Sequence, residues 1–177
     1  MCKTKILVFL ILLFLSLTNV KIFSQKKRGI RAVDFRNFTY IPAGETSDSE
    51  IELRKGRAVD DAGQVSKLVS VQYADLNGDG REDAAVFITT QVFGSMGNYD
   101  DYYVFEYADG EAQRIFHLGV EVGRGMRVVG RTLLISEPFW TERDGQCCPS
   151  YMQTTTYRWR GAEFVKTSLR RNRIKKR

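Results

Sequence analysis

Short runs in which apolar and polar residues alternate, separated by turn residues, most constrain what this chain can fold into. Alternation with a period of two places successive side chains on opposite faces of a strand, whereas a helix needs an apolar stripe with a period of 3.6. No stretch carries a helical stripe of useful length, so the chain is expected to be all-β. The segments predicted as strands are 35–41, 68–74, 84–91, 102–107, 112–118, 126–129, 132–137, 151–159 and 163–167.

Three short connections between these segments have the residues of tight hairpins: Asp109-Gly110, Gly130-Arg131 and Arg160-Gly161-Ala162. Strands joined by such turns run antiparallel, so the sequence predicts a mostly antiparallel meander that forms a sandwich or a strongly curled sheet. A full propeller is not expected, because the acidic Gly-rich loop described next has no second copy at the spacing of a propeller blade.

The segment 75–83, Asp-Leu-Asn-Gly-Asp-Gly-Arg-Glu-Asp, has the spacing of a calcium loop. Oxygen-bearing side chains stand at loop positions one, three, five and nine around a glycine at position six, and calcium takes about six to eight oxygen ligands. The predicted ligands are the side chains of Asp75, Asn77, Asp79 and Asp83 and the carbonyl of Arg81, completed by water. The alternative is a loop of Asx-turns that joins two strands and binds no metal.

A strand, not a helix, is expected to follow this loop. Val86 stands at the twelfth position, where an EF-hand has a bidentate Glu, and it belongs to an apolar run. Residues 75–87 therefore resemble the calcium loops of the FG-GAP and VCBS repeats of secreted and cell-surface β proteins. The resemblance implies calcium as a cofactor.

The order of features along the chain is similar to that of a group of uncharacterised exported bacterial proteins. The shared features are the Asp-Phe-Arg-Asn-Phe-Thr-Tyr segment at 34–40, the Gly-Asp-Gly loop with its apolar strand, a Gly-rich hairpin and Cys147-Cys148-Pro149. This resemblance implies a fold and a compartment, and it implies no activity.

The N-terminus has the pattern of an export signal. Lys3 and Lys5 precede an apolar run at residues 6–17, about twelve residues that are too few to span a bilayer but suit a secretory signal. Residues 1–24 are predicted to be a signal peptide, with an uncleaved anchor as the alternative. The protein is then exported to the periplasm or the exterior, with no transmembrane span in the mature chain.

Charge is distributed unevenly along the chain. Residues 32–169 carry 14 Lys and Arg against all 21 Asp and Glu, so the excess of positive charge lies at the ends. We expect a basic linker at 25–31, one β domain at 32–169 and a disordered basic tail at 170–177. No specific nucleic-acid partner is indicated, and the tail is expected to make weak contact with an anionic polymer or lipid at most.

Two adjacent cysteines, Cys147 and Cys148, are the only ones after the predicted signal. In an oxidising compartment they are expected to form a vicinal disulfide that stiffens a loop, since Gly145 and Pro149 suit such a turn. Free thiols, a bridge to another chain or a soft-metal site with His117 are the alternatives.

Aromatic residues form stripes along two predicted strands. Tyr103, Phe105 and Tyr107 share one face of their strand, and Tyr157 and Trp159 share a face of another. Such stripes usually fill a core. The alternative is a binding surface for a glycan or partner protein that includes Tyr103, Phe105, Tyr107 and Trp159.

Few residues have a catalytic pattern. His117 is the single histidine, and the adjacent carboxylates Asp100 and Asp101 should point to opposite faces of a strand. The chain is therefore not expected to be an enzyme, and its expected role is that of a calcium-stabilised binding or structural module of the cell envelope or exterior. The alternatives are a carboxylate-dependent hydrolase of envelope polymers and a scaffold that grips an anionic polymer with its basic tail.

Overall fold

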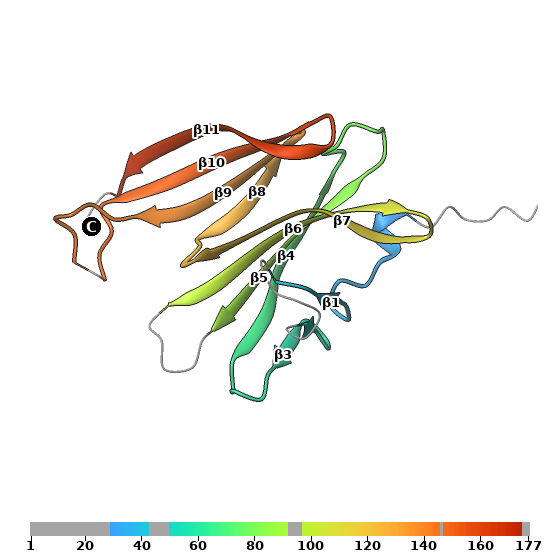
Figure 1. The fold of residues 1–177 in the computed structure, drawn as a ribbon, viewed down its shortest axis with the longest axis horizontal. Coiled ribbons are helices and arrows are strands. Elements are labelled where there is room, and N and C mark those ends of the chain that lie inside the picture. Colours follow the sequence, from blue (N-terminus) through green and yellow to red (C-terminus); the bar gives the residue numbers. More distant parts are fainter. Residues whose placement is uncertain (1–28, 43–49, 92–96, 146, 175–177) are drawn as a thin grey trace, which may run out of the picture.

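The computed structural model describes residues 29–42, 50–91, 97–145 and 147–174 (Figure 1). The predicted signal peptide lies outside the described residues, as do residues 25–28 of the predicted linker and residues 175–177 of the predicted tail. No helix in the described part of the chain is long and apolar enough to cross a membrane.

Two antiparallel sheets make up most of the molecule. The five-stranded sheet contains, in spatial order, β3 (Arg57–Val59), β4 (Val65–Ala74), β5 (Asp83–Gln91), β6 (Asn98–Ala108) and β7 (Glu111–Glu121). The four-stranded sheet has the order β11 (Glu163–Arg173), β10 (Tyr151–Arg160), β9 (Thr132–Phe139) and β8 (Gly125–Val129). A small third sheet pairs β1 (Thr39–Tyr40) with β2 (Ile51–Glu52), after the single-turn 3-10 helix η2 (Ile30–Ala32). The predicted all-β meander is confirmed, and none of the sheets closes into a barrel or propeller.

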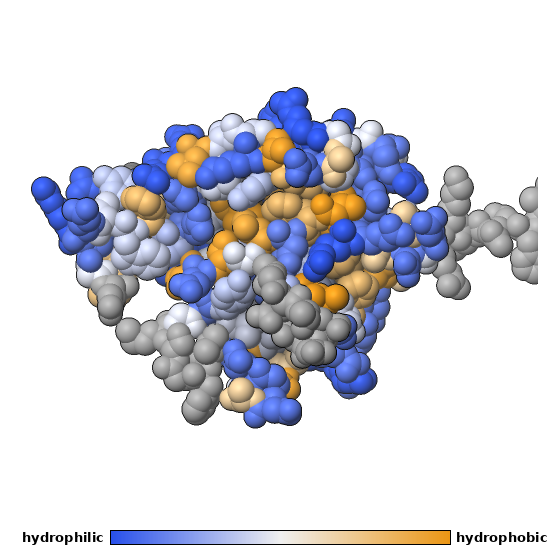
Figure 2. All heavy atoms as spheres, viewed as in Figure 1, coloured by the Kyte–Doolittle hydropathy of each residue, from blue (hydrophilic) through white to orange (hydrophobic). Residues whose placement is uncertain are grey.

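The two large sheets pack face to face over a shared core. Its buried members are Leu76, Ala85, Phe87, Tyr102, Val104, Leu133, Ile135 and Phe164. A second core, on the opposite face of the five-stranded sheet, contains Ile30, Phe35, Tyr40, Leu53, Ala84, Val86, Ile88, Tyr103 and Phe105. Because both faces of β5 and β6 are buried, the run at 84–88 is apolar without alternation. Figure 2 shows hydrophobic residues in the middle of the viewed face, surrounded mostly by hydrophilic ones.

The predicted hairpins are all present. They join β6 to β7, β8 to β9 and β10 to β11. In the first of them, Asp109 and Gly110 have φ values of 53° and 92°, which is the left-handed backbone that a two-residue hairpin of strongly twisted strands requires. The local sequence of these three turns is therefore sufficient to predict them.

The N-terminal boundary and the first predicted strand are wrong. Residues 35–41 form a strand only at Thr39–Tyr40, because the Asp34 carboxylate accepts hydrogen bonds from the backbone of Arg36 (3.1 Å) and the side chain of Asn37 (2.7 Å) and holds a turn. Ile30 is buried in the second core, and Arg31 pairs with Glu82 of the acidic loop. The β domain therefore includes Ile30 and Arg31, which the charge pattern of the sequence places in the basic linker.

The predicted boundary at Leu169 is also wrong. β11 continues to Arg173, and residues 170–173 pair in register with residues 151–154 of β10. Most of the side chains of β11 are exposed, yet its backbone completes a ladder with β10. Residues 170–173 are thus the end of an edge strand, not the start of a disordered tail.

Candidate functional site

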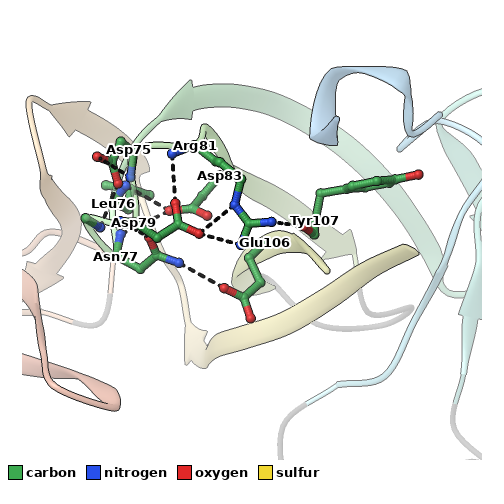
Figure 3. Close-up of polar contacts among 10 residues, drawn as sticks. Asp75, Leu76, Asn77, Asp79, Arg81, Asp83, Glu106 and Tyr107 are labelled. Carbon is green, nitrogen blue, oxygen red and sulfur yellow. Dashed lines mark hydrogen bonds and ion pairs between the residues drawn. The ribbon is translucent and has the colours of Figure 1, made fainter. Parts of the chain in front are cut away.

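The acidic loop connects β4 to β5 at one end of the five-stranded sheet (Figure 3). Gly78 and Gly80 have φ values of 85° and 83°, a conformation that favours glycine and that lets the chain reverse twice within six residues. A Cβ added to Gly78 would overlap the guanidinium of Arg131, which comes from the turn between β8 and β9. The loop is therefore in contact with the four-stranded sheet as well.

The first half of the loop wraps around the carboxylate of Asp75. Its two oxygens accept hydrogen bonds from the backbone amides of Gly78 (2.6 Å) and Gly80 (3.3 Å). The side-chain oxygen of Asn77 accepts from the amide of Asp79 (3.0 Å), and its NH₂ group donates to Glu106 on β6 (2.9 Å). The bond between Asn77 and the Asp79 amide is an Asx-turn, and together these contacts fix the two side chains that stand at loop positions one and three.

Asp83 closes the loop and is almost fully buried, with 1% of its surface exposed. One of its oxygens accepts hydrogen bonds from the amides of Leu76 (2.8 Å) and Asn77 (3.0 Å). Burial raises the pKa of this carboxyl to about 6, and the nearby charges of Asp79 and Asp75 act in the same direction. The carboxyl is therefore mostly ionised at neutral pH, and a cation beside it would stabilise the charged form.

Asp79 is paired with Arg81 in this structure. One carboxylate oxygen accepts hydrogen bonds from Nε (2.8 Å) and Nη2 (2.6 Å) of Arg81, and the other accepts from the Arg81 amide (2.8 Å). The side-chain hydrogen bond from Arg81 is the main reason that the pKa of Asp79 lies below its ordinary value. Arg81 also donates to the carbonyl of Tyr107 (3.1 Å), so its guanidinium links the loop to the end of β6.

The chemistry of the loop fits a hard cation, although its ligands are not assembled. Asp75, Asn77, Asp79 and Asp83 supply oxygen donors, as calcium prefers. In the described residues, however, no three His, Cys, Asp or Glu side chains are grouped as a metal cluster requires. Because Asp79 is turned to Arg81, a bound ion would have to take this carboxylate from the guanidinium. The sequence spacing names Arg81 only for its carbonyl, and it gives no sign of the contacts made by the Arg81 guanidinium, Glu106 and Arg131.

The predicted vicinal disulfide is present between Cys147 and Cys148. It lies in the connection from β9 to β10, where Asp144 accepts hydrogen bonds from the amides of Thr141 (2.7 Å) and Ser150 (3.1 Å) and from the Ser150 hydroxyl. These bonds, led by the Ser150 hydroxyl, lower the pKa of Asp144 to about 2. The disulfide therefore lies in a loop whose two ends are joined by the hydrogen bonds of Asp144 to Thr141 and Ser150. This agrees with the interpretation of the pair as one that stiffens a loop.

The aromatic residues offered as a binding surface do not form one. Tyr103 and Phe105 are buried in the second core, with 0% and 4% of their surface exposed, and Tyr107 packs partly buried against the same core. Trp159 belongs to the other sheet and packs against Phe164, with ring centroids 5.3 Å apart. The interpretation of these stripes as core is therefore correct.

Asp100 and Asp101 point to opposite faces of β6, as the alternation predicts. Asp101 binds His117 (2.7 Å), whose ring stacks on Tyr103. Asp100 faces the other core, and burial raises its pKa above the ordinary value. Among the described residues, its Oδ1 and the hydroxyl of Tyr102 are buried without a hydrogen-bond partner. The two carboxylates do not converge on one site, so they give no support to a paired-carboxylate hydrolase.

No protein-family model matches the chain, and neither a curated protein nor a solved structure matches it. The likeness to FG-GAP and VCBS loops and to exported bacterial proteins therefore stays a prediction that rests on the quoted residues.

Proposed function

We propose that this protein is an exported all-β domain that binds calcium in the 75–83 loop and serves as a binding or structural module of the cell envelope or exterior. The observation that carries the proposal is the construction of the loop. Asp75 and Asp83, at its two ends, are both held by the loop's own amides, with Asn77 and Asp79 between them. The signal-like residues 1–24 support export.

In this proposal, the side-chain oxygens of Asp75, Asn77, Asp79 and Asp83 and the carbonyl of Arg81 hold the ion, which supplies two positive charges to an acidic site. The chain contributes the preformed turns and a buried carboxylate at the start of β5. Because the same loop touches both large sheets, stabilising it stabilises their packing. Calcium is then a structural ion of the module and takes no part in a reaction.

Thermal unfolding of the mature protein with millimolar calcium and with chelator tests the proposal. Calcium at a hundredfold excess over Kd should raise the free energy of unfolding by about 2.7 kcal/mol. Asp79→Asn should abolish most of that gain. Asp109→Asn is the matched control, because it removes one carboxylate from a hairpin where Asn adopts the same left-handed backbone. An unchanged melting temperature of the wild-type protein on adding calcium would overturn the proposal.

A further inference from the structure

The outer face of the four-stranded sheet, opposite the shared core, carries four exposed arginines: Arg127 on β8, Arg158 and Arg160 on β10, and Arg170 on β11. The strand register places them on this face. Leu133, Ile135 and Phe164 point into the core, and the arginines occupy the positions of the sheet that alternate with the core positions. We call these four residues the arginine face. In Figure 1, no other described element covers this side of β8–β11.

Charge differs between the two sheets. The strands of the four-stranded sheet contain seven Lys and Arg against two Asp and Glu. The strands of the five-stranded sheet contain three Lys and Arg against six Asp and Glu. The ion pairs among the described residues involve none of the arginine face, and Arg158 donates only to the hydroxyl of Thr132 (3.2 Å). Arg160 stands opposite Glu163 across the strands, whereas Arg127, Arg158 and Arg170 have no acidic cross-strand neighbour in the described part of the sheet. These three guanidiniums therefore present uncompensated positive charge on a rigid sheet.

The arginines are spread over the sheet and are not gathered into a pocket. Arg127 and Arg170 stand on its two edge strands, about 15 Å apart, and Arg158 and Arg160 lie about 7 Å apart along β10. Between them lie hydroxyl side chains, including Ser136 and Thr154, which are hydrogen-bonded to each other (3.0 Å). This arrangement suits an extended ligand with repeated anionic groups and free hydroxyls, not a single small anion.

We propose that the arginine face docks a linear anionic polysaccharide. The inference rests on the proposed role as a binding module and does not depend on the calcium loop. The cross-strand neighbours of the arginines on this face include no aromatic residue, so bases have nothing to stack on and a nucleic acid is disfavoured. A bilayer is disfavoured because the apolar neighbours of the arginines, Leu134 and Val165, are only partly exposed and lie among hydroxyl groups. The most exposed apolar side chain of the face, Val129, stands at the end of β8.

Binding of the full chain to heparin, a sulfated polysaccharide, measured over a range of salt concentrations, tests this inference. The wild-type protein should bind at low salt, with an affinity that falls steeply as salt rises. The variant R127Q/R170Q removes two arginines whose side chains make no hydrogen bond or ion pair among the described residues. It should bind about tenfold more weakly at low salt, and the slope of log K against log salt should decrease by about 2.

The matched control is R57Q/K67Q, which removes the same charge from two exposed, cross-strand neighbours of the five-stranded sheet. It should bind as the wild type does. Equal losses in both variants would show that net charge matters and the face does not, and would overturn the inference. Absence of heparin binding by the wild type, or binding to anionic vesicles in its place, would also overturn it.

A second measurement needs no variant. Chemical modification of arginine in the wild-type protein, read out by peptide mass spectrometry, should be slowed by heparin at Arg127, Arg158 and Arg170 and unchanged at Arg57. Equal protection at all four positions would contradict a defined docking face. Calcium binding is tested by the melting experiment and the arginine face by heparin binding. A negative result in one experiment therefore does not affect the interpretation of the other.

Discussion

At the scale of single residues, the side chain of Arg81 helps to hold the acidic loop together. Its guanidinium binds the Asp79 carboxylate twice and the Tyr107 carbonyl once, so an internal cation occupies one of the expected calcium ligands. Arg81 stands at position seven of the loop. In calcium loops the backbone carbonyl of this position is a ligand. The loop spacing alone therefore gives no sign that the side chain competes with the ion.

Arg81→Gln is expected to tighten calcium binding about threefold to fivefold, the size of effect that an exposed ion pair has. The ion no longer has to displace the guanidinium from Asp79, while the backbone carbonyl stays. Calorimetric titration measures the change. Arg54→Gln, which breaks the exposed pair with Glu52, is the control and should leave the affinity unchanged. Weaker binding by Arg81→Gln would mean that the side chain supports the site.

At the scale of elements, β11 shows how a basic run whose composition predicts a disordered tail becomes ordered. Its residues 170–173 gain order from backbone pairing with β10, which the composition of the run itself does not reveal. The Arg171 guanidinium lies over the ring of Phe139, 3.6 Å from its centroid, and its Nε donates to Gln153 (2.9 Å). Charged residues along an exposed edge also oppose pairing with another chain. The polar composition of residues 170–173 is therefore that of an exposed edge strand.

Truncation after Leu169 is therefore expected to destabilise the protein by about 2 kcal/mol, since several backbone hydrogen bonds of about 1 kcal/mol each are lost. Urea unfolding monitored by far-UV circular dichroism measures the effect. Truncation after Ile174 removes basic residues that lie beyond the described ladder, and it should leave the midpoint unchanged. Equal midpoints for both truncated proteins would show that the end of β11 contributes nothing to stability.

At the scale of the whole molecule, the parts that the sequence predicts are those that local chemistry determines. The period-two pattern, together with the continuous apolar run of β5, predicts β4 to β10 to within a few residues, and turn residues predict three of the hairpins. The N-terminal segment could not be read in this way, because Phe35 and Tyr40 are ordered by contacts with Phe105, distant in sequence. The same holds at the loop, where the spacing of the oxygen-bearing side chains can be read from the sequence, whereas Glu106 and Arg131 contact the loop from other elements.

The shared core makes the two large sheets one cooperative unit, and Phe87→Ala tests this. Phe87 belongs to β5, whereas both tryptophans, Trp140 and Trp159, lie on or beside the four-stranded sheet. Because Phe87 packs in the core between the sheets, its truncation should cost about 3–5 kcal/mol. Tryptophan fluorescence and far-UV circular dichroism should report the same lowered urea midpoint.

Val69→Ala is the control for this experiment, because Val69 is an apolar residue of the neighbouring strand β4 with 51% of its surface exposed. Neither signal should shift by more than about 0.5 kcal/mol in that variant. If Phe87→Ala shifts the circular dichroism transition and leaves the fluorescence transition in place, the four-stranded sheet unfolds independently. The arginine face would then stand on a unit that calcium at the 75–83 loop does not stabilise.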